Sequence, residues 1–141
     1  MNRLRLPAVM ESLDLFRSFL EQELERLGLD PARRLEIELV LEELLTNIIR
    51  YAYAGGRGEV EVSYFLEGRL RFCLALRDWG RGFNPLESAS PDLALNLEQR
   101  PLGGLGLYLA GQLADKIKYQ YEAGANQVTL CFDLAQPAAV S

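Results

Sequence analysis

The spacing of apolar residues alternates between a helical and a strand period along the chain, and this pattern limits what the chain can fold into. Between residues 11 and 28, apolar side chains recur every three or four positions, which predicts a helix. The pair Asp30 and Pro31 predicts the start of a second helix, because an aspartate cap followed by a first-turn proline favours helix initiation. That helix is expected to run to about Ala54. Beyond it the apolar period falls to two, which is typical of strands with one buried face.

The period-two segments predict a sheet, and the helices on either side of them predict how it is covered. We expect strands near residues 3–7, 59–64, 69–77, 117–121 and 127–134, and a third helix over about 104–116. Short turns join the second strand to the third and the fourth to the fifth, so these pairs should be antiparallel hairpins. The predicted fold class is an α+β two-layer sandwich, with a mixed, mainly antiparallel sheet and helices on one face. We expect one domain over residues 1–136 and a C-terminal tail over 137–141.

The composition excludes several classes of chemistry. The 141 residues include no histidine, so neither a Ser-His-Asp or Cys-His nucleophile nor a histidine-ligated zinc site can form. Acid–base chemistry must therefore use other groups, such as carboxylates. The net charge is −5, whereas nucleic-acid binding favours a basic face. We therefore expect no direct contact with nucleic acid.

The remaining composition points to a protein of the cell interior. No apolar stretch approaches the length of about 20 residues that a membrane span needs, and no apolar run follows the charged N-terminus as in a signal peptide. We therefore expect a cytoplasmic protein that does not bind membranes. The two cysteines, Cys73 and Cys131, have no metal-type spacing, and we expect a reduced pair.

The second predicted helix carries the first candidate site. Glu43 and Asn47 are four residues apart and so lie one turn apart on one helix face, which borders the apolar face. An amide oxygen is a hard ligand suited to Mg²⁺, and a carboxylate can take a proton from a nucleophile. The alternative is an ordinary solvated helix face that is rich in glutamate.

The end of the third predicted strand carries the second candidate site. Asp78 has the same parity as the apolar residues of that strand, so its side chain should point toward the helices rather than to solvent. Gly80 and Gly82 follow it, and alternate glycines of this kind favour a close approach of the backbone to a ligand. The alternative is a structural aspartate that caps a turn.

A cluster of glycines carries the third candidate site. Gly103, Gly104 and Gly106 lie where a helix is predicted to begin after a loop of about 20 residues. Glycine destabilises a helix, whereas small residues and free N–H groups at a helix start can bind phosphate. The alternative is a flexible hinge. A Walker A loop is excluded because no Gly-Lys-Ser/Thr occurs, and the glycines do not follow the first strand of a Rossmann βαβ unit.

The three motifs follow one another in the order typical of GHKL (Bergerat-fold) ATPases, which the chain resembles over residues 3–134. They correspond to the N box, G1 box and G2 box of that superfamily. Within it the chain is most similar to the anti-sigma factor serine-protein kinases, through the stretches LEIELVLEELLTNIIRYAY and GGLGLYLAGQLADKIKY. The resemblance implies the histidine-kinase-like ATPase fold and an ATP lid over about residues 83–102.

The resemblance also implies a role for each motif residue. Asn47 would coordinate Mg²⁺, and Glu43 would be the general base; its neighbour Glu42 points about 100° away on the helix and is less suited. Asp78 would accept a hydrogen bond from the adenine amino group. The residues implied to approach the nucleotide through their backbone are Gly80 and Gly82 at the adenine and ribose, and Gly104, Leu105, Gly106 and Leu107 at the phosphates.

The sequence departs from the family's pattern in two places. The family often has a histidine near the end of the N-box helix, where this chain has Arg50 and Tyr51. A Gly-Thr is common in the last hairpin, where this chain has Gly124-Ala125-Asn126. Asn126 could supply a hydrogen bond similar to that of the threonine.

The implied function is that of a Mg²⁺- and ATP-dependent anti-sigma factor. It would phosphorylate a serine or threonine of an anti-anti-sigma (STAS-domain) partner, sequester a sigma factor and form a homodimer. A sensor histidine kinase shares the three boxes, but this sequence offers no histidine to accept the phosphate. Two alternatives remain: an ATP-binding regulatory interaction module without phosphotransfer, and an α+β domain whose glycine clusters are only loops.

Overall fold

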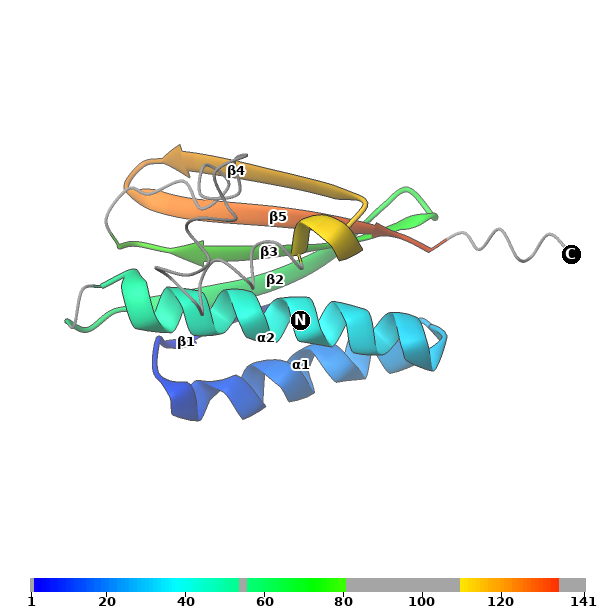
Figure 1. Ribbon diagram of the computed structural model, residues 1–141, viewed down its shortest axis with the longest axis horizontal. Coiled ribbons are helices and arrows are strands. Elements are labelled where there is room, and N and C mark those ends of the chain that lie inside the picture. The colour runs from blue at the N-terminus through cyan, green and yellow to red at the C-terminus, as the bar shows by residue number, and fades with distance from the viewer. Residues whose placement is uncertain (1, 54–55, 81–109, 135–141) are drawn as a thin grey trace, which may run out of the picture.

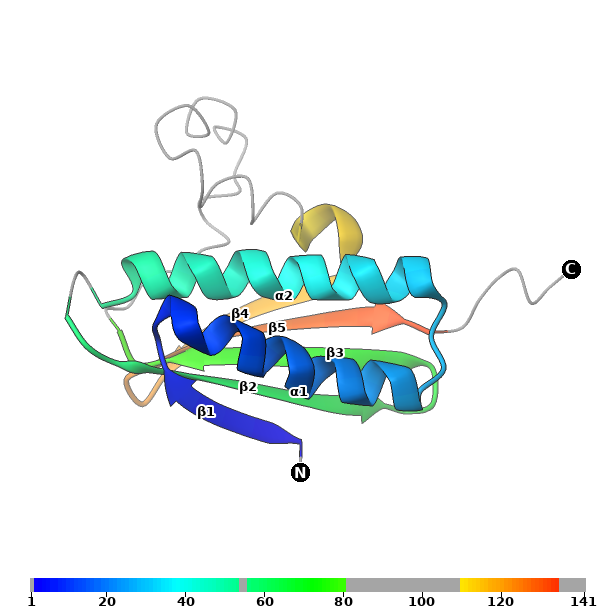
Figure 2. The same ribbon diagram turned by 90° about the horizontal axis from the view of Figure 1, so that it is seen from below.

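The computed structural model describes residues 2–53, 56–80 and 110–134, and every structural statement here concerns those residues. Two long helices lie side by side on one face of a five-stranded sheet (Figures 1 and 2). The two-layer sandwich expected from the sequence is therefore confirmed. The elements are β1 (Arg3–Pro7), a 3₁₀ helix (Met10–Ser12), α1 (Leu13–Arg26), α2 (Pro31–Tyr51), β2 (Glu59–Glu67), β3 (Arg71–Asp78), β4 (Lys116–Glu122) and β5 (Ala125–Asp133).

The helices begin and end close to the predicted places. Gly28 adopts a φ of +68°, the left-handed conformation that commonly ends a helix, and it follows α1 as expected. Asp30 occupies the position before α2, but its side chain makes no capping hydrogen bond, so Pro31 is the effective start signal. Helix α2 ends at Tyr51, three residues before the predicted Ala54. The described part of the third helix covers 110–113 and ends before the predicted residue 116, because Lys116 already pairs in β4.

The strands are ordered β1-β2-β3-β5-β4, and every pairing among the described strands is antiparallel. The mainly antiparallel sheet is thus confirmed, with no parallel pair among those strands. Gly68 has a φ of +67° in the turn between β2 and β3, and Ala123 and Gly124 have φ values of 55° and 79° between β4 and β5. Two consecutive positive φ values are the signature of a tight hairpin turn that matches the twist of the strands. The pairing of β3 with β5 joins the two hairpins into one sheet.

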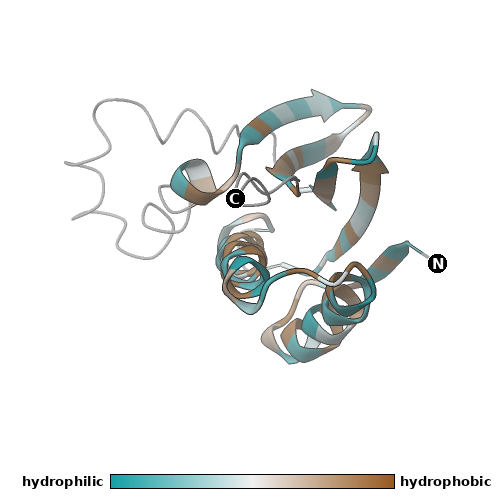
Figure 3. Cartoon of the chain, turned by 90° about the vertical axis from the view of Figure 1, so that its right-hand side faces the viewer, coloured by the Kyte–Doolittle hydropathy of each residue, from teal (hydrophilic) through white to brown (hydrophobic). Residues whose placement is uncertain are grey.

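The hydrophobic core lies between the helices and the sheet. Figure 3 shows the sheet curving over the two helices when the layers are seen end-on. Alternate residues of the central strands point into this layer, as their parity predicted; Leu70 shares that parity but lies just before β3 and is exposed. Among described residues, the most deeply buried core side chains include Phe16, Leu20, Leu24, Ile37, Leu41, Leu45, Phe72, Leu74, Leu76, Leu130 and Phe132.

The two cysteines contradict the expectation of a reduced pair. Cys73 in β3 and Cys131 in β5 are direct register partners, with their Cα atoms 4.1 Å apart, and they form a disulfide. Both side chains are buried although they belong to the sheet face opposite the helices. The sequence concealed this bond because 58 residues separate the cysteines and only the β3–β5 pairing brings them together.

No helix in the described ranges is both long enough and apolar enough to cross a membrane.

Reduction of the disulfide should lower the free energy of unfolding. The bond closes a 58-residue loop, and the chain-entropy model gives a stabilisation of up to about 4 kcal/mol for such a loop. Urea denaturation with and without dithiothreitol measures the difference. The double variant Cys73→Ala/Cys131→Ala is the control and should not respond to the reductant. An unchanged wild-type midpoint, with both thiols shown free by mass spectrometry, would contradict the expectation.

Candidate functional site

The predicted Asp78 site lies where three elements end or begin. The C-terminal end of α2, the end of β3 and the start of β5 meet at one end of the molecule, on the left in Figure 1. Asp78 is the last residue of β3 and pairs in register with Asn126 of β5. Its side chain is only 6% exposed, so the inward orientation expected from strand parity is confirmed.

Two donors hold the carboxylate of Asp78. The backbone N–H of Gly80 donates to Oδ1 at 2.9 Å, and Nδ2 of Asn126 donates to the same oxygen at 3.0 Å. Nδ2 of Asn126 also lies 3.4 Å from the carbonyl oxygen of Gly80, and the Tyr119 hydroxyl donates to Oδ1 of Asn126. Within the described residues no hydrogen-bond donor reaches Oδ2 of Asp78. Because no fully buried side-chain oxygen or nitrogen there lacks a partner, Oδ2 is not fully buried. Oδ2 is therefore open to a ligand.

Burial dominates the electrostatics of this carboxylate. Desolvation raises the pKa of Asp78 above its usual range, and the hydrogen bonds from Gly80 and Asn126 only partly offset that rise. A donor that reached Oδ2 would favour the charged form and so relieve part of the desolvation cost. The site is accordingly suited to a ligand group that donates an N–H, such as an exocyclic amine.

Gly80 has a structural reason that the sequence did not reveal. A Cβ at this position would overlap the carbonyl oxygen of Ala52, the residue that caps α2. The expected close approach of the backbone at Gly80 is real, but in the described structure its partner is the end of α2. This contact draws the chain leaving β3 against the helix that carries Glu43 and Asn47.

Tyr53 reinforces the same junction and was missed from the sequence. Its hydroxyl accepts from the N–H of Trp79 at 2.8 Å and donates to the carbonyl of Glu59 at 2.5 Å. It thereby joins the segment after α2 to the start of β2 and the end of β3. A Cβ at Gly58 would overlap the Tyr53 ring, so the ring packs directly on that backbone. A lone tyrosine beyond a helix has no periodicity that could have marked it.

Glu43 and Asn47 are half-buried residues of α2. The neighbouring Glu42 faces α1, because its Oε2 pairs with Nη2 of Arg17 at 3.0 Å. Successive helix residues turn by about 100°, so Glu43 points away from that ion pair. In the described part of the chain no side chain forms a hydrogen bond with the side chain of Glu43 or Asn47. Their carboxylate and amide oxygens are therefore free to bind a ligand.

The described residues account for part of the predicted site only. Gly82, the glycine cluster at Gly103, Gly104 and Gly106 with Leu105 and Leu107, and the predicted lid over 83–102 lie outside them. What the structure brings together is Asp78, Gly80 and Asn126 at the end of α2. Asn47 is a little over one turn before that end.

Replacing Gly80 by alanine should destabilise the fold. The new methyl group meets the Ala52 carbonyl, and overpacking of this kind costs about 1–3 kcal/mol. Gly111→Ala is the matched control, because a Cβ at Gly111 meets nothing within 4 Å and Gly111 lies in a helix. Urea denaturation should therefore show a loss for Gly80→Ala and no loss for Gly111→Ala. Equal stability of the two variants would refute the contact.

The raised pKa of Asp78 predicts a pH-dependent difference between wild type and Asp78→Asn. The protonated form is favoured by folding, so its stabilisation is fully present below the ordinary pKa of 3.8 and is lost as pH rises through the higher folded pKa. Asparagine does not titrate and keeps an acceptor for Gly80. Urea unfolding of both proteins from about pH 4 to pH 8 should show the variant gaining relative stability with rising pH. The opposite slope would count against the burial effect.

Comparison of the sequence with known proteins identifies relatives of this chain. The model of the histidine kinase-like ATPase domain matches residues 6–132. The serine-protein kinase RsbW of Bacillus cereus (strain AH820) is 30% identical over 124 residues, which cover 86% of this chain and 78% of the relative. RsbW of Bacillus mycoides (strain KBAB4) is 28% identical over the same length and coverage.

Solved structures agree on the fold. The RsbU and RsbW domains of Rv1364c from Mycobacterium tuberculosis superpose with a TM-score of 0.64 at 20% identity, covering 97% of this chain and 34% of that one. The Acinetobacter baumannii histidine kinase AdeS gives a TM-score of 0.53 at 19% identity, covering 94% of this chain and 68% of that one. A family match over residues 6–132, with the fold that these structures share, leaves one conclusion: this chain belongs to the histidine kinase-like ATPase family.

Proposed function

We propose that this protein is a Mg²⁺-dependent, ATP-binding serine/threonine-protein kinase that acts as an anti-sigma regulatory factor in the cytoplasm. Membership of the ATPase family supports the binding of ATP. The RsbW relatives, which are serine-protein kinases by name, support a serine or threonine as the acceptor. The acceptor is a serine or threonine of an anti-anti-sigma partner with a STAS domain. A sigma factor is the second partner, and a homodimer is the proposed form.

The observation that best supports this proposal is the open Oδ2 of Asp78. A buried carboxylate with one oxygen held by Gly80 and Asn126 presents the other to a ligand donor. The adenine amino group is such a donor, and its hydrogen bond would favour the ionised carboxylate against the cost of burial. Asp78 is therefore the proposed adenine-recognition residue, with Gly80 passing beside the base.

Glu43 and Asn47 fit a magnesium ion and a nucleophile. Asn47 supplies an amide oxygen and Glu43 a carboxylate one turn away, both of which suit Mg²⁺ or its bound water. Neither forms an ion pair within the described ranges. When bound, the ion neutralises phosphate charge. Glu43 would accept the proton of the attacking hydroxyl. Asn47 would hold the ion through its amide oxygen. The pairing of Glu42 with Arg17 makes Glu42 less suited to the role of base.

Calorimetric titration with Mg-ATP tests the nucleotide site. Wild type should bind, whereas Asp78→Asn, which keeps the shape but presents an amide N–H or a weaker acceptor to the base, should bind at least tenfold more weakly, about the loss of one charge-assisted hydrogen bond. Urea denaturation establishes that the variant is folded. Absence of wild-type binding would reject both the kinase and a simple ATP-binding module.

Transfer of labelled γ-phosphate to the STAS-domain partner tests the chemistry. Glu43→Gln should keep ATP affinity within about threefold but lower phosphotransfer by about 10²–10⁴, the usual contribution of a general base. Glu42→Gln is the matched control and should retain activity. Labelling that is equal in the two variants would remove Glu43 from the mechanism. ATP binding without any labelled partner would favour the regulatory module without phosphotransfer.

A further inference from the structure

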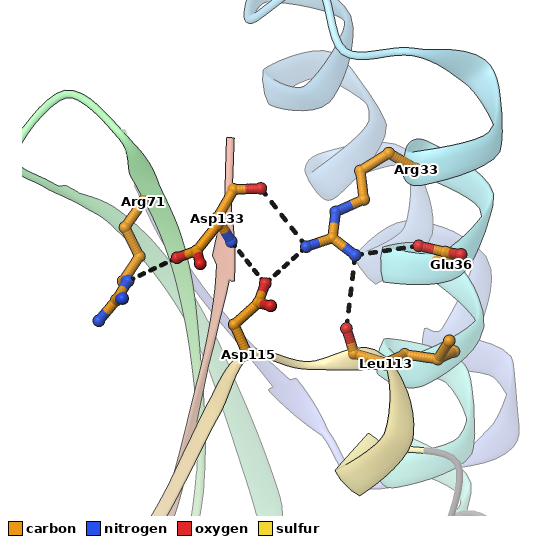
Figure 4. Close-up of polar contacts among 6 residues, drawn as sticks. All are labelled: Arg33, Glu36, Arg71, Leu113, Asp115 and Asp133. Carbon is orange, nitrogen blue, oxygen red and sulfur yellow. Dashed lines mark hydrogen bonds and ion pairs between the residues drawn. The ribbon is translucent and has the colours of Figure 1, made fainter. Parts of the chain in front are cut away.

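Arg33 joins three parts of the chain that are distant in sequence. It lies in the first turn of α2, and its side chain is 19% exposed. Figure 4 shows its guanidinium reaching from α2 toward the segment after the third helix and the end of β5. Nη2 donates to Oδ2 of Asp115 at 2.6 Å and approaches the carbonyl of Asp133 at 3.4 Å. Nη1 donates to Glu36 at 3.0 Å and approaches the carbonyl of Leu113 at 3.4 Å.

Further contacts make this junction a well-defined anchor. Asp115 also accepts from the backbone N–H of Asp133 at 2.7 Å, and its own N–H donates to the carbonyl of Cys131 at 2.8 Å. The guanidinium carbon of Arg33 lies 5.4 Å from the centre of the Phe132 ring. Ala110 is fully buried in the core. Residues 110–115 are thus held at one end by apolar packing and at the other by Arg33.

The anchor faces the same side of α2 as the proposed catalytic residues. At about 100° per residue, positions 33, 36, 40, 43 and 47 fall within about 80° of one another on the helix. Arg33 and Glu43 are ten residues apart, which is about 15 Å along the axis. The anchored segment begins four residues after the glycine cluster of residues 103–106 ends in the sequence. Its attachment point on α2 therefore lies on the helix stripe that carries Glu43 and Asn47.

We propose that Arg33 is a positioning residue for the nucleotide reaction. Through Asp115 and the Leu113 carbonyl it sets where residues 110–115 lie relative to Glu43 and Asn47. It touches no reacting group and acts through this segment. A lysine could replace it only in part, because one ammonium cannot reach the acceptors on both sides of the planar guanidinium. The effect on the nucleotide rests on the proposed function.

Hydrogen exchange tests the anchor without any nucleotide. The variants are Arg33→Met, which keeps the aliphatic stem, and Asp115→Asn. Arg71→Met is the matched control: Arg71 lies at the same end of the sheet and bonds Asp133 at 2.9 Å but forms no hydrogen bond or ion pair with residues 113–115. The amides of Ala114 and Asp115 should exchange at least about tenfold faster in the first two variants and at the wild-type rate in the control. Unchanged exchange in Arg33→Met would overturn the proposal.

Nucleotide binding then separates positioning from simple support. Arg33→Met and Asp115→Asn should each weaken Mg-ATP binding by about five- to tenfold, and the double variant should lose less than the sum of the two, because both substitutions remove the Arg33–Asp115 contact. Arg33→Lys should lie between wild type and Arg33→Met, and Arg71→Met should stay within about twofold. Faster exchange with wild-type affinity would leave Arg33 a structural role only and reject positioning. If wild type itself bound no ATP, the proposed function would fail, while the exchange result would still decide the anchor.

Discussion

Strands β3 and β5 pair through eight consecutive residues at the centre of the sheet, although the chain leaves β3 at Asp78 and enters β5 only at Ala125. This ladder connects two local hairpins that could otherwise form separately. It also places Asp78 opposite Asn126, Cys73 opposite Cys131 and Arg71 opposite Asp133. One register thus determines the candidate site, the disulfide and the ion pair at the far end. A slip of one residue would turn Asp78 to solvent and the cysteines into the core.

Helix α2 takes its place in the molecule from contacts at both ends. Its C-terminal end is held by the close packing of Gly80 on Ala52 and by the Tyr53 hydroxyl between Glu59 and Trp79. Its first turn is held by Arg33 on Asp115. Apolar packing fixes the helix against the sheet, but such packing has little directional preference. The polar and steric contacts at the two ends supply the position along the axis that Glu43 and Asn47 need.

The charged side chains of this acidic protein differ in energetic effect according to how deeply they are buried. The surface ion pairs, such as Arg5 with Glu59, lie in solvent and contribute little to stability. Asp78 differs because it is buried without a cationic partner among the described residues, and neutral donors from Gly80 and Asn126 compensate only one of its oxygens. Such a carboxylate lowers the stability of the free protein. A ligand that donates a hydrogen bond to it would offset part of that desolvation cost. Under the proposed function, Asp78 would trade stability for ligand recognition, as binding sites typically do.

The sequence by itself determined the order and kind of the elements, because helical and strand periodicities are local properties of consecutive side chains. It also determined that Asp78 points inward and that Glu43 and Asn47 share a helix face, since both follow from parity and helix pitch. Only the tertiary structure decided that β1 pairs with β2 and that β3 pairs with β5, and so decided the disulfide and the Asp78–Asn126 pair. The same holds for Gly80 against Ala52, for Tyr53 and for Arg33, each of which has a partner 26 or more residues away. Contacts between distant segments leave no periodic trace along the chain, because they depend on how whole elements pack.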